Sequence, residues 1–410
     1  MQAIARDTPA LPLPPPPSGW RDRLLRWAER LVSQPGFRHQ AARLWLTRPL
    51  ARRRARALFD LVAGFTYSQV LLACVRLALF DRLAAGPQTL RALAPALDLA
   101  PEPCRRLLDA AVALRLLRRE PPPAGQPEDL ARYRLGPLGA PMVGNGALAA
   151  MVEHHALLYA DLADPLAMLR QPPGQGALAR YWAYAGHSGS QALPDAEVAR
   201  YSMLMAASQP LVADEVLDAY PMAGHAVLMD VGGGEGVFAA TALQRWPRLR
   251  AVVFDLPAVA ARAQVRLAQK GLLDRATAVG GSFLTDALPQ GADLVSLVRV
   301  VHDHDDEAVL ALLRRVHAAL PPHGTLLLAE PLAGTPGAQA MGDAYFGLYL
   351  WAMGSGRPRS IAQLTALLQQ AGFARPRLLA NALPLQTRVL ITRPDASTRR
   401  QATGDPQVGS

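Results

Sequence analysis

The clearest pattern of hydrophobic and polar positions begins near residue 226. From there, short apolar runs of strand length alternate with segments whose apolar residues recur at helical spacing. Alternating strands and helices imply a mostly parallel sheet with right-handed crossovers, and two last strand patterns predict a C-terminal hairpin. The predicted strands are 227–231, 250–255, 275–279, 293–298 and 324–330, and the hairpin strands are 375–381 and 386–393.

The first half of the chain shows helical spacing instead. Residues 20–48 alternate arginine with large apolar side chains, which predicts one basic amphipathic helix, either packed on the next domain or lying on a membrane surface. Apolar runs at 57–80, 88–97 and 101–118, followed by a strand pattern at 132–135, predict a winged-helix-like module. The second and third helices of this module are balanced in charge, so we interpret it as an interaction module and not as a DNA-binding one.

Residues 146–222 are again predicted to be helical and carry many aromatic side chains and histidines. Core packing explains each of them singly, whereas together they are able to line a pocket between domains. These residues are His154, His155, Tyr159, Tyr181, Trp182, Tyr184 and His187. At the ends of the chain, the Pro-rich residues 1–19 are predicted to be disordered or polyproline-like, and residues 394–410 to form a loose polar tail.

The net charge of +10 alone would suggest nucleic acid as a partner, but its distribution along the chain argues against this. Residues 1–60 contribute +8 of it, so the excess belongs to an N-terminal extension. The two cysteines, Cys74 and Cys104, lack the spacing of a disulfide framework or zinc site and fit a reducing cytosol. No signal peptide is visible, and the apolar run 70–80 is shorter than the roughly 20 residues of a spanning helix. We expect a cytoplasmic protein, at most peripheral to a membrane.

A glycine-rich turn follows the strand 227–231 and precedes a helical pattern that starts at Val237. Glycines let a backbone approach a ligand closely, and the helix N-terminus offers unpaired N–H groups. Asp255 ends the next strand, where a carboxylate is able to accept both hydroxyls of a ribose. An ordinary tight turn, or a nicotinamide cofactor, explains the same pattern, so these residues indicate a nucleoside without saying which one.

His302 follows the fourth strand pattern and Glu330 ends the fifth. Ligands of open α/β sheets bind beyond the carboxyl ends of the strands, which makes His302 the candidate base and Glu330 the acid that orients it. A capping or core role for this histidine is the alternative. A helix starting at Asp303 would turn His304 away from the pocket, which disfavours a metal site formed by the two histidines.

Four motifs occur in an order that resembles S-adenosylmethionine-dependent O-methyltransferases of the plant caffeate/acetylserotonin type. That family has a winged-helix-like dimerisation domain before a seven-stranded Rossmann-like catalytic domain, and the resemblance covers roughly residues 55–393. The segments 58–70, 302–306 and 356–360 resemble its carotenoid branch, the hydroxyneurosporene and demethylspheroidene O-methyltransferases of photosynthetic purple bacteria. The four motifs are Asp-x-Gly-x-Gly-x-Gly at 230–236, Phe-Asp-Leu-Pro at 254–257, Gly-Gly-Ser-Phe at 280–283 and Val-Val-His-Asp at 300–303.

The resemblance implies a role for each matching residue. The loop that starts at Asp230 would face the methionine part of S-adenosylmethionine, Asp255 the ribose, and Ser282 and Phe283 the adenine. His302 would accept the proton, with Glu330 holding its tautomer. The chain has Val298 where the family often has lysine, so Arg299 is expected to contact the cofactor instead. The glycines that are expected to bind the cofactor are Gly232, Gly234 and Gly236.

Other departures from the family concern the acceptor. The family usually has Asp-Met where Ser282-Phe283 stands, and tryptophan where His304 stands. Phenol-specific members hold the histidine between two glutamates, but only Glu330 matches, since Pro358 occupies the second position. This disfavours a phenol and favours a more apolar acceptor.

We therefore expect methyl transfer to the hydroxyl of an acyclic carotenoid by a homodimer whose basic N-terminus is able to touch the photosynthetic membrane, with no nucleic-acid or metal partner. A small phenol or a bacteriochlorophyll precursor as acceptor, a winged-helix regulator with a vestigial catalytic fold, and a nicotinamide dehydrogenase remain alternatives. The expected divisions of the chain are an extension at 1–54, a dimerisation domain with linker helices at 55–222, a methyltransferase domain at 223–393 and a tail at 394–410.

Overall fold

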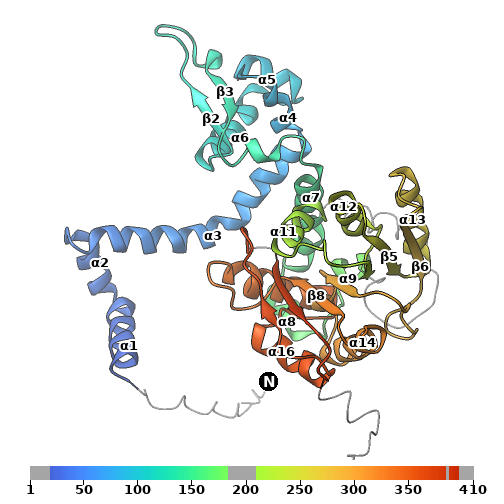
Figure 1. Cartoon of the computed structure of the whole chain (residues 1–410). Coiled ribbons are helices and arrows are strands. Elements are labelled where there is room, and N and C mark those ends of the chain that lie inside the picture. The colour runs from blue at the N-terminus through green and yellow to red at the C-terminus, as the bar shows by residue number, and fades with distance from the viewer. Residues whose placement is uncertain (1–18, 183–208, 385–386, 397–410) are drawn as a thin grey trace, which may run out of the picture.

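The computed structural model describes residues 19–182, 209–384 and 387–396 (Figure 1). The Pro-rich segment 1–18, Tyr184, His187 and the tail beyond residue 396 lie outside the described residues, so the predictions made for them stay predictions.

The N-terminal arm consists of two helices, and the prediction of one helix over 20–48 is wrong. Helix α1 (Trp20–Ser33) ends before Pro35, which starts α2 (Pro35–Arg43). The residue between them, Gln34, is extended, with φ −78° and ψ 124°. A proline disfavours helical backbone at the residue before it, and it has no N–H to continue the helix.

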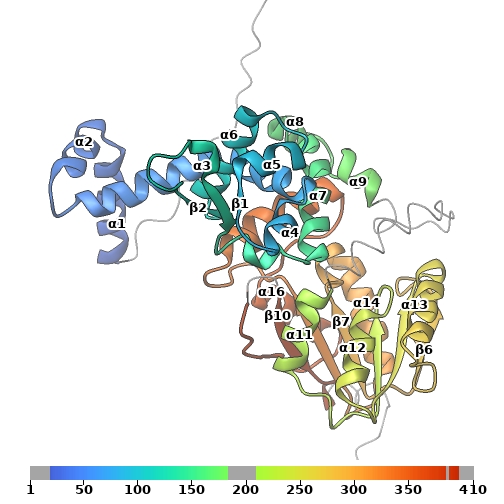
Figure 2. The ribbon, with the colours of Figure 1, turned by 90° about the horizontal axis from the view of Figure 1, so that it is seen from above.

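Helix α3 (Arg48–Arg76) links this arm to the rest of the molecule. The N-terminal end of α3 projects away from the winged module and the large sheet (Figures 1 and 2). The helix is longer than the apolar run 70–80 suggested. It is the one helix among the described residues whose length and composition would allow it to cross a membrane. Its last turns bury Leu72 and Cys74 in a protein core, so length and composition alone do not make it a membrane span.

The next segment forms a small winged module, as the sequence predicts. Three helices surround a short sheet of strand order β1-β3-β2, in which β3 pairs antiparallel with both neighbours. Cys74 and Cys104 are both free and buried in its core, which fits packing and no disulfide between them. The elements are α4 (Leu79–Ala84), β1 (Gln88–Thr89), α5 (Leu90–Ala96), α6 (Pro101–Ala113), β2 (Leu117–Glu120) and β3 (Arg132–Leu135).

Among the described residues, four further helices connect this module to the large sheet. Helix α7 (Gly146–Asp161) is the longest, and it lies beside both α9 and a C-terminal helix, α15 (Phe346–Met353). The contact between α7 and α15 brings a helix that precedes the large sheet in sequence against a helix that follows its fifth parallel strand. The remaining connecting helices are α8 (Pro165–Arg170), α9 (Ala177–Tyr181) and α11 (Pro210–Ala219).

The large sheet has seven strands in the order β6-β5-β4-β7-β8-β10-β9. The first five pair in parallel, and β10 pairs antiparallel with both β8 and β9, which confirms the predicted parallel sheet and C-terminal hairpin. The Rossmann-like arrangement expected from the resemblance is therefore confirmed. The strands are β4 (Val227–Val231), β5 (Arg250–Asp255), β6 (Ala276–Gly280), β7 (Leu294–Val298), β8 (Thr325–Glu330), β9 (Arg377–Leu378) and β10 (Arg388–Thr392).

Helices cover both faces of the large sheet. One apolar core packs the sheet against α11, α12 and α13, and the other packs it against α14 and α16. The strand order reverses between β4 and β7, and ligands of such sheets bind at the carboxyl edge beside this reversal. The helices are α12 (Val237–Arg245), α13 (Pro257–Gln269), α14 (Asp306–Ala319) and α16 (Ile361–Gln370), and a π-helix (Ala340–Tyr345) precedes α15.

Candidate active site

The glycine loop after β4 adopts a backbone that needs its glycines. Gly232, Gly234 and Gly236 have φ of 67°, 57° and 75°, in the left-handed region where side chains are strained. A Cβ on Gly232 would also lie 2.8 Å from the side chain of Val300, in the loop after β7. The loop therefore packs closely against the second half of the site, while the Cβ side of Gly234 faces open space.

Two carboxylates lie under and beside this loop. Asp230 is fully buried, and its Oδ1 accepts a 2.6 Å hydrogen bond from Ser296. Its Oδ2 has no partner among the described residues. Burial is the main cause that raises the pKa of Asp230 to about 7, while the hydrogen bond from Ser296 acts to lower this pKa and the nearby charge of Asp255 acts to raise it. The site thus holds an excess of negative charge.

Asp255 is tied to the glycine loop. Its Oδ2 accepts a hydrogen bond from the backbone of Gly234 at 2.8 Å, and its Oδ1 accepts one from Leu256 at 2.7 Å. A carboxylate oxygen is able to accept more than one hydrogen bond, so these two contacts do not by themselves prevent Asp255 from accepting a ligand hydroxyl. Pro257 starts α13 directly afterwards, so the end of β5 both fixes this carboxylate and begins the helix.

The loop after β6 supplies one aromatic wall. Phe283 lies next to Gly232, with a ring carbon 3.7 Å from the position of a Cβ on that glycine. The edge of His304 packs against the same ring, with centroids 5.3 Å apart. Ser282 is engaged within its own loop, since its hydroxyl accepts from Leu284 and its N–H donates to Asp286. Phe283 is therefore the better placed of the two to contact a ligand.

These groups fit S-adenosylmethionine, which is not part of the structure. An orphaned buried carboxylate oxygen and two adjacent acids suit a ligand that carries positive charge and ribose hydroxyls. The residues that would hold it are Asp230, Asp255, Phe283 and the glycine loop. When bound, it supplies an electrophilic methyl group on sulfur.

The other half of the site is a histidine held by a glutamate. Nδ1 of His302 lies 2.6 Å from Oε2 of Glu330, and both side chains are buried. Oε1 of Glu330 accepts hydrogen bonds from the backbone N–H groups of Val300 and Val301, at 2.9 and 2.7 Å. The carboxylate at the end of β8 therefore fixes both the imidazole and the loop that carries it.

Asp303 is a neighbour of the base that the sequence did not single out. Its Oδ1 lies 3.1 Å from Nε2 of His302, the nitrogen that faces away from Glu330. Burial acts to lower the pKa of His302, but the charges of Asp303 and Glu330 outweigh it and raise that pKa above its ordinary value. A resting imidazole between two carboxylates is thus biased toward the charged form.

The prediction that a helix starts at Asp303 is wrong. A 3₁₀ turn covers Val301–Asp303, and α14 begins only at Asp306, with Asp305 as its N-cap. Consequently His304 is not turned away from the site but packs on Phe283. No group of three or more histidine, cysteine, aspartate or glutamate side chains is arranged to hold a metal among the residues that the structure describes.

Arg299 has an unusual backbone at the mouth of β7. It is one of few non-glycine residues with positive φ, at 60°, and its N–H donates to Ala329 of β8. Its guanidinium charge acts to lower the pKa values of Tyr345 and Tyr349, although their burial raises both. The charge of Arg299 thus acts on the acceptor side of the site, and its contact with the cofactor stays a prediction.

Two histidine–tyrosine pairs close that side. Nε2 of His154 lies 2.7 Å from the hydroxyl of Tyr349, and Nε2 of His155 lies 2.7 Å from that of Tyr345. Burial lowers the pKa of His154 to about 4, so this imidazole is neutral at pH 7. The pairs join α7 to the helical segment whose Phe346 packs on His302, with centroids 5.6 Å apart.

Sequence reasoning found the two histidines of these pairs but missed their tyrosine partners. An aromatic run at i, i+1 and i+4 over 345–349 was the available signal. The pocket-lining role expected for the aromatic residues and histidines of 146–222 stays a prediction, and Phe346 of the run 345–349 packs on His302.

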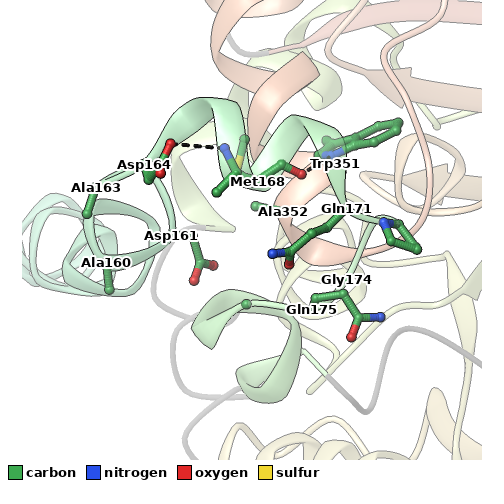
Figure 3. Close-up of a pocket in the computed structure, with 13 residues that line it drawn as sticks. Ala160, Asp161, Ala163, Asp164, Met168, Gln171, Gly174, Gln175, Trp351 and Ala352 are labelled. Carbon is green, nitrogen blue, oxygen red and sulfur yellow. Dashed lines mark hydrogen bonds between the residues drawn. The ribbon is translucent and has the colours of Figure 1, made fainter. Parts of the chain in front are cut away.

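A pocket of about 280 Å³ lies elsewhere, between the end of α7, α8, the loop 171–176 and α15 (Figure 3). None of the predicted site residues lines it. Asp161 in its wall has both oxygens engaged by the backbone N–H groups that begin α9, Ala177 at 2.6 Å and Leu178 at 2.9 Å. Trp351 donates to the carbonyl oxygen of Met168 at 3.2 Å. These polar groups are therefore structural, and the carboxyl edge of the large sheet remains the candidate site.

Comparison with known proteins defines the class. A model of the O-methyltransferase domain matches residues 159–374, just over half of the chain, and a model of the O-methyltransferase dimerisation domain matches residues 59–144. The chain belongs to the O-methyltransferase family, whose members use S-adenosylmethionine. The nicotinamide dehydrogenase and the winged-helix regulator are thereby set aside.

Individual relatives extend the match over most of the chain. Demethylspheroidene O-methyltransferase of Cereibacter sphaeroides is 42% identical over 369 residues, which are 90% of this chain and 95% of that protein. Acetylserotonin O-methyltransferase of Mus musculus is 33% identical over 79% of this chain and 84% of its own length. The crystal structure of human N-acetylserotonin methyltransferase in complex with SAM has the same fold, with a TM-score of 0.69 over 84% of this chain and 98% of that one, at 24% identity.

Proposed function

We propose that this O-methyltransferase methylates the hydroxyl of an acyclic hydroxylated carotenoid and that His302 is its base. The observation that carries the proposal is the hydrogen-bonded pair of His302 and Glu330 at the same sheet edge as the glycine loop. In the neutral imidazole of His302, the carboxylate of Glu330 holds the proton on Nδ1. Nε2 is then the nitrogen that accepts the proton of the acceptor hydroxyl. An aliphatic hydroxyl is too weak an acid to ionise beforehand, so its proton leaves as the new bond forms.

Glu330 and Asp303 divide two tasks between them. Glu330 is nearly inaccessible and fixes the ring and its tautomer. Asp303 lies at Nε2, where the acceptor hydroxyl has to arrive, and its charge stabilises the imidazolium that proton transfer creates. The buried site excludes water and strengthens both interactions.

The carotenoid assignment has three supports. The relative that is 42% identical over 90% of the chain is named a demethylspheroidene O-methyltransferase. The acceptor side is lined by aromatic rings, among them Phe346 and Tyr345. Pro358 stands where phenol-specific members of the family have a second glutamate. An apolar acceptor with a single hydroxyl suits this site better than a phenol does.

The assignment is tested by supplying the protein with methyl-labelled S-adenosylmethionine and three acceptors in separate detergent-dispersed reactions. These are an acyclic carotenoid with a tertiary hydroxyl, the same carotenoid without the hydroxyl, and a catechol. We expect a labelled methyl ether from the first alone, identified by mass spectrometry. Labelling of the catechol alone contradicts the carotenoid assignment. In a further reaction with a pigment extract, labelling of a bacteriochlorophyll precursor would make that precursor the acceptor in place of the carotenoid.

We also propose that the chain is a homodimer in which a second copy covers the N-terminal half of α3, with dimerisation and methyltransferase domains that meet near residue 222. The match to the dimerisation domain supports the dimer, as do large apolar side chains left exposed on this half of the helix. They are Leu58, Phe59, Leu61, Val62 and Phe65, each more than 60% exposed. Leu61→Asp together with Phe65→Asp should give a monomer in sedimentation, and a dimer that persists contradicts this interface.

The arm formed by α1 and α2 is proposed to place the protein on the cytoplasmic face of a membrane. Trp20, Leu24 and Trp27 recur at helical spacing on α1 and are all more than half exposed. No residue of either helix is buried. The arginines that begin α3 add positive charge to the same N-terminal part of the chain. Exposed apolar and basic groups together are typical of helices that lie at an anionic lipid surface.

A further inference from the structure

The segment 354–359 lies against the loop 301–306, although 50 residues separate them in the sequence. Arg357 donates its backbone N–H to the carbonyl oxygen of His302 at 3.0 Å, and the hydroxyl of Ser355 donates to the carbonyl oxygen of Asp303 at 2.8 Å. Gly356 has φ 80°, and a Cβ there would lie 2.1 Å from the carbonyl oxygen of His302. The approach is so close that only glycine fits.

Arg359 is the deepest residue of this segment. Its side chain is buried, and it donates from Nη1 to the carbonyl oxygen of Val301 at 2.7 Å and from Nη2 to that of His304 at 2.6 Å. Nε donates to Oδ1 of Asp306 at 2.8 Å, the first residue of α14. One guanidinium therefore holds the loop on both sides of His302.

The backbone of Arg359 is fixed in turn by the loop after β8. Its carbonyl oxygen accepts a 3.0 Å hydrogen bond from Ala333, and it forms a parallel bridge with Leu332. Glu330 stands only two residues earlier. Arg359 thus joins the loop that carries the base to the loop that carries the acid orienting it.

Burying an arginine is unfavourable unless its charge is paired and its donors are hydrogen-bonded. Arg359 donates to two backbone carbonyls of the catalytic loop and to the carboxylate of Asp306. Lysine cannot reproduce the arrangement, because its ammonium is a single point and not a planar fork. Removing the side chain takes the guanidinium donors away from the carbonyl oxygens of Val301 and His304, on either side of His302.

We propose that Arg359 is a positioning residue for the reaction: it sets the distance of the His302 imidazole from Glu330 and from the acceptor hydroxyl by holding the loop 301–306. The role rests on the proposed function of His302 as the base. A positional error of about 1 Å at a reacting group lowers the rate on the order of 10²-fold.

The test compares Arg359→Lys and Arg359→Met with Arg357→Met. The side chain of Arg357 pairs with the same Asp306, through Oδ2 at 2.6 Å, but its side chain donates to no carbonyl of the catalytic loop. We expect the two Arg359 variants to lose kcat on the order of 10²-fold, with an affinity for S-adenosylhomocysteine close to that of the wild type. Arg357→Met should keep its kcat within about threefold.

A second readout does not depend on turnover. The His302 pKa is followed by NMR with an isotope label at the histidine rings, assigned by the signal lost in His302→Ala. The groups that face this imidazole are Asp303, Glu330, Arg299 and His304. Because the two carboxylates hold the pKa above its ordinary value, a loosened loop should let it fall in Arg359→Lys and not in Arg357→Met.

Three outcomes overturn the positioning role. They are a wild-type kcat and His302 pKa in Arg359→Lys, an equal loss in Arg357→Met, and a loss that disappears once activity is referred to the folded fraction seen by circular dichroism. If Arg359→Met does not fold, Arg359→Lys decides. Should the wild type methylate none of the carotenoids, the proposed substrate fails, while the pKa comparison still decides the role of Arg359.

Discussion

Nδ1 of His302 and Oε2 of Glu330 lie 2.6 Å apart at the ends of two neighbouring parallel strands, β7 and β8. The same carboxylate accepts from the backbone at 300 and 301, so its position does not depend on the imidazole alone. The pair is therefore set up before any acceptor arrives, and its consequences for catalysis are measurable.

His302→Ala should lower kcat by about 10²–10⁴-fold, because a general base acts in the transition state. The affinity for S-adenosylhomocysteine, measured by calorimetry, should stay near that of the wild type. His304→Ala is the informative neighbour: its ring packs on Phe283, so we expect a weaker affinity with kcat largely kept. If turnover survives in His302→Ala but not in His304→Ala, His302 is not the base.

Asp303→Asn should move the acidic limb of the kcat/KM profile to lower pH. The base works as the neutral imidazole, so activity is lost as the pH falls through the pKa of His302. Asp303 and Glu330 raise this pKa above 6.5, and removing one of the two charges lowers it again. Measuring kcat/KM of the wild type and the variant across about pH 5.5–9 tests this. If the acidic limb stays in place or moves to higher pH, it does not report the pKa of His302.

Asp255→Ala should weaken cofactor binding by about 1.5–3 kcal/mol, the usual range for hydrogen bonds to a charged group. The variant also leaves the N–H of Gly234 without the carboxylate that now accepts from it. Titration with S-adenosylhomocysteine measures the loss. Asp274→Ala, at a carboxylate that is 70% exposed, is the matched control, and equal affinities in the two variants would remove Asp255 from the cofactor site.

Asp230→Asn should stabilise the ligand-free protein at high pH and not at low pH. The folded-state pKa of Asp230, about 7, lies above its value in the unfolded chain, so the folded state binds the proton more tightly. Its contribution to stability is thus full at low pH and is lost as the pH rises to about 7. The difference in unfolding free energy should grow by roughly 1.4 kcal/mol per pH unit between about pH 5 and 7. Urea titrations at several pH values measure it, and a constant difference contradicts the raised pKa.

Charge reversal at the arginines that begin α3 should release the protein from anionic liposomes. Each cation near such a surface contributes about 1 kcal/mol. Flotation at low salt compares this variant with one that reverses four exposed arginines of the sheet domain, and equal release of the two argues against an oriented arm. The first set is Arg52, Arg53, Arg54 and Arg56, and the control set is Arg248, Arg314, Arg375 and Arg377.

Short-range patterns in the sequence were enough for the sheet and for much of the site. The strand 227–231 and its glycine turn are local signals, and Glu330 could be paired with His302 because both follow predicted neighbouring strands. The start of α14 was misplaced, because aspartates at 303, 305 and 306 are all suitable helix N-caps. Tertiary contacts of Asp305 and Asp306 with the segment 356–359 accompany the later start.

The remaining site features depend on contacts between distant segments. His155 meets Tyr345 across 190 positions, and Arg359 meets Val301 across 58. The aromatic run over 345–349 does not indicate which residue Tyr345 contacts, and no local pattern distinguishes Arg359 from an ordinary surface arginine. Burial of Arg359 is decided by the fold around it, and composition or periodicity does not encode that.

The π-helix Ala340–Tyr345 gives this enzyme a simple means of changing its acceptor. A π-helical turn is an α-helical one with an additional residue, and one residue of an α-helix corresponds to a rotation of about 100°. Deleting a single position there would change the rotation of the preceding chain relative to α15, next to the Tyr345 hydroxyl that pairs with His155 on α7. Insertion and deletion, and not substitution alone, are thus a route by which one scaffold of this family can be fitted to differently shaped molecules.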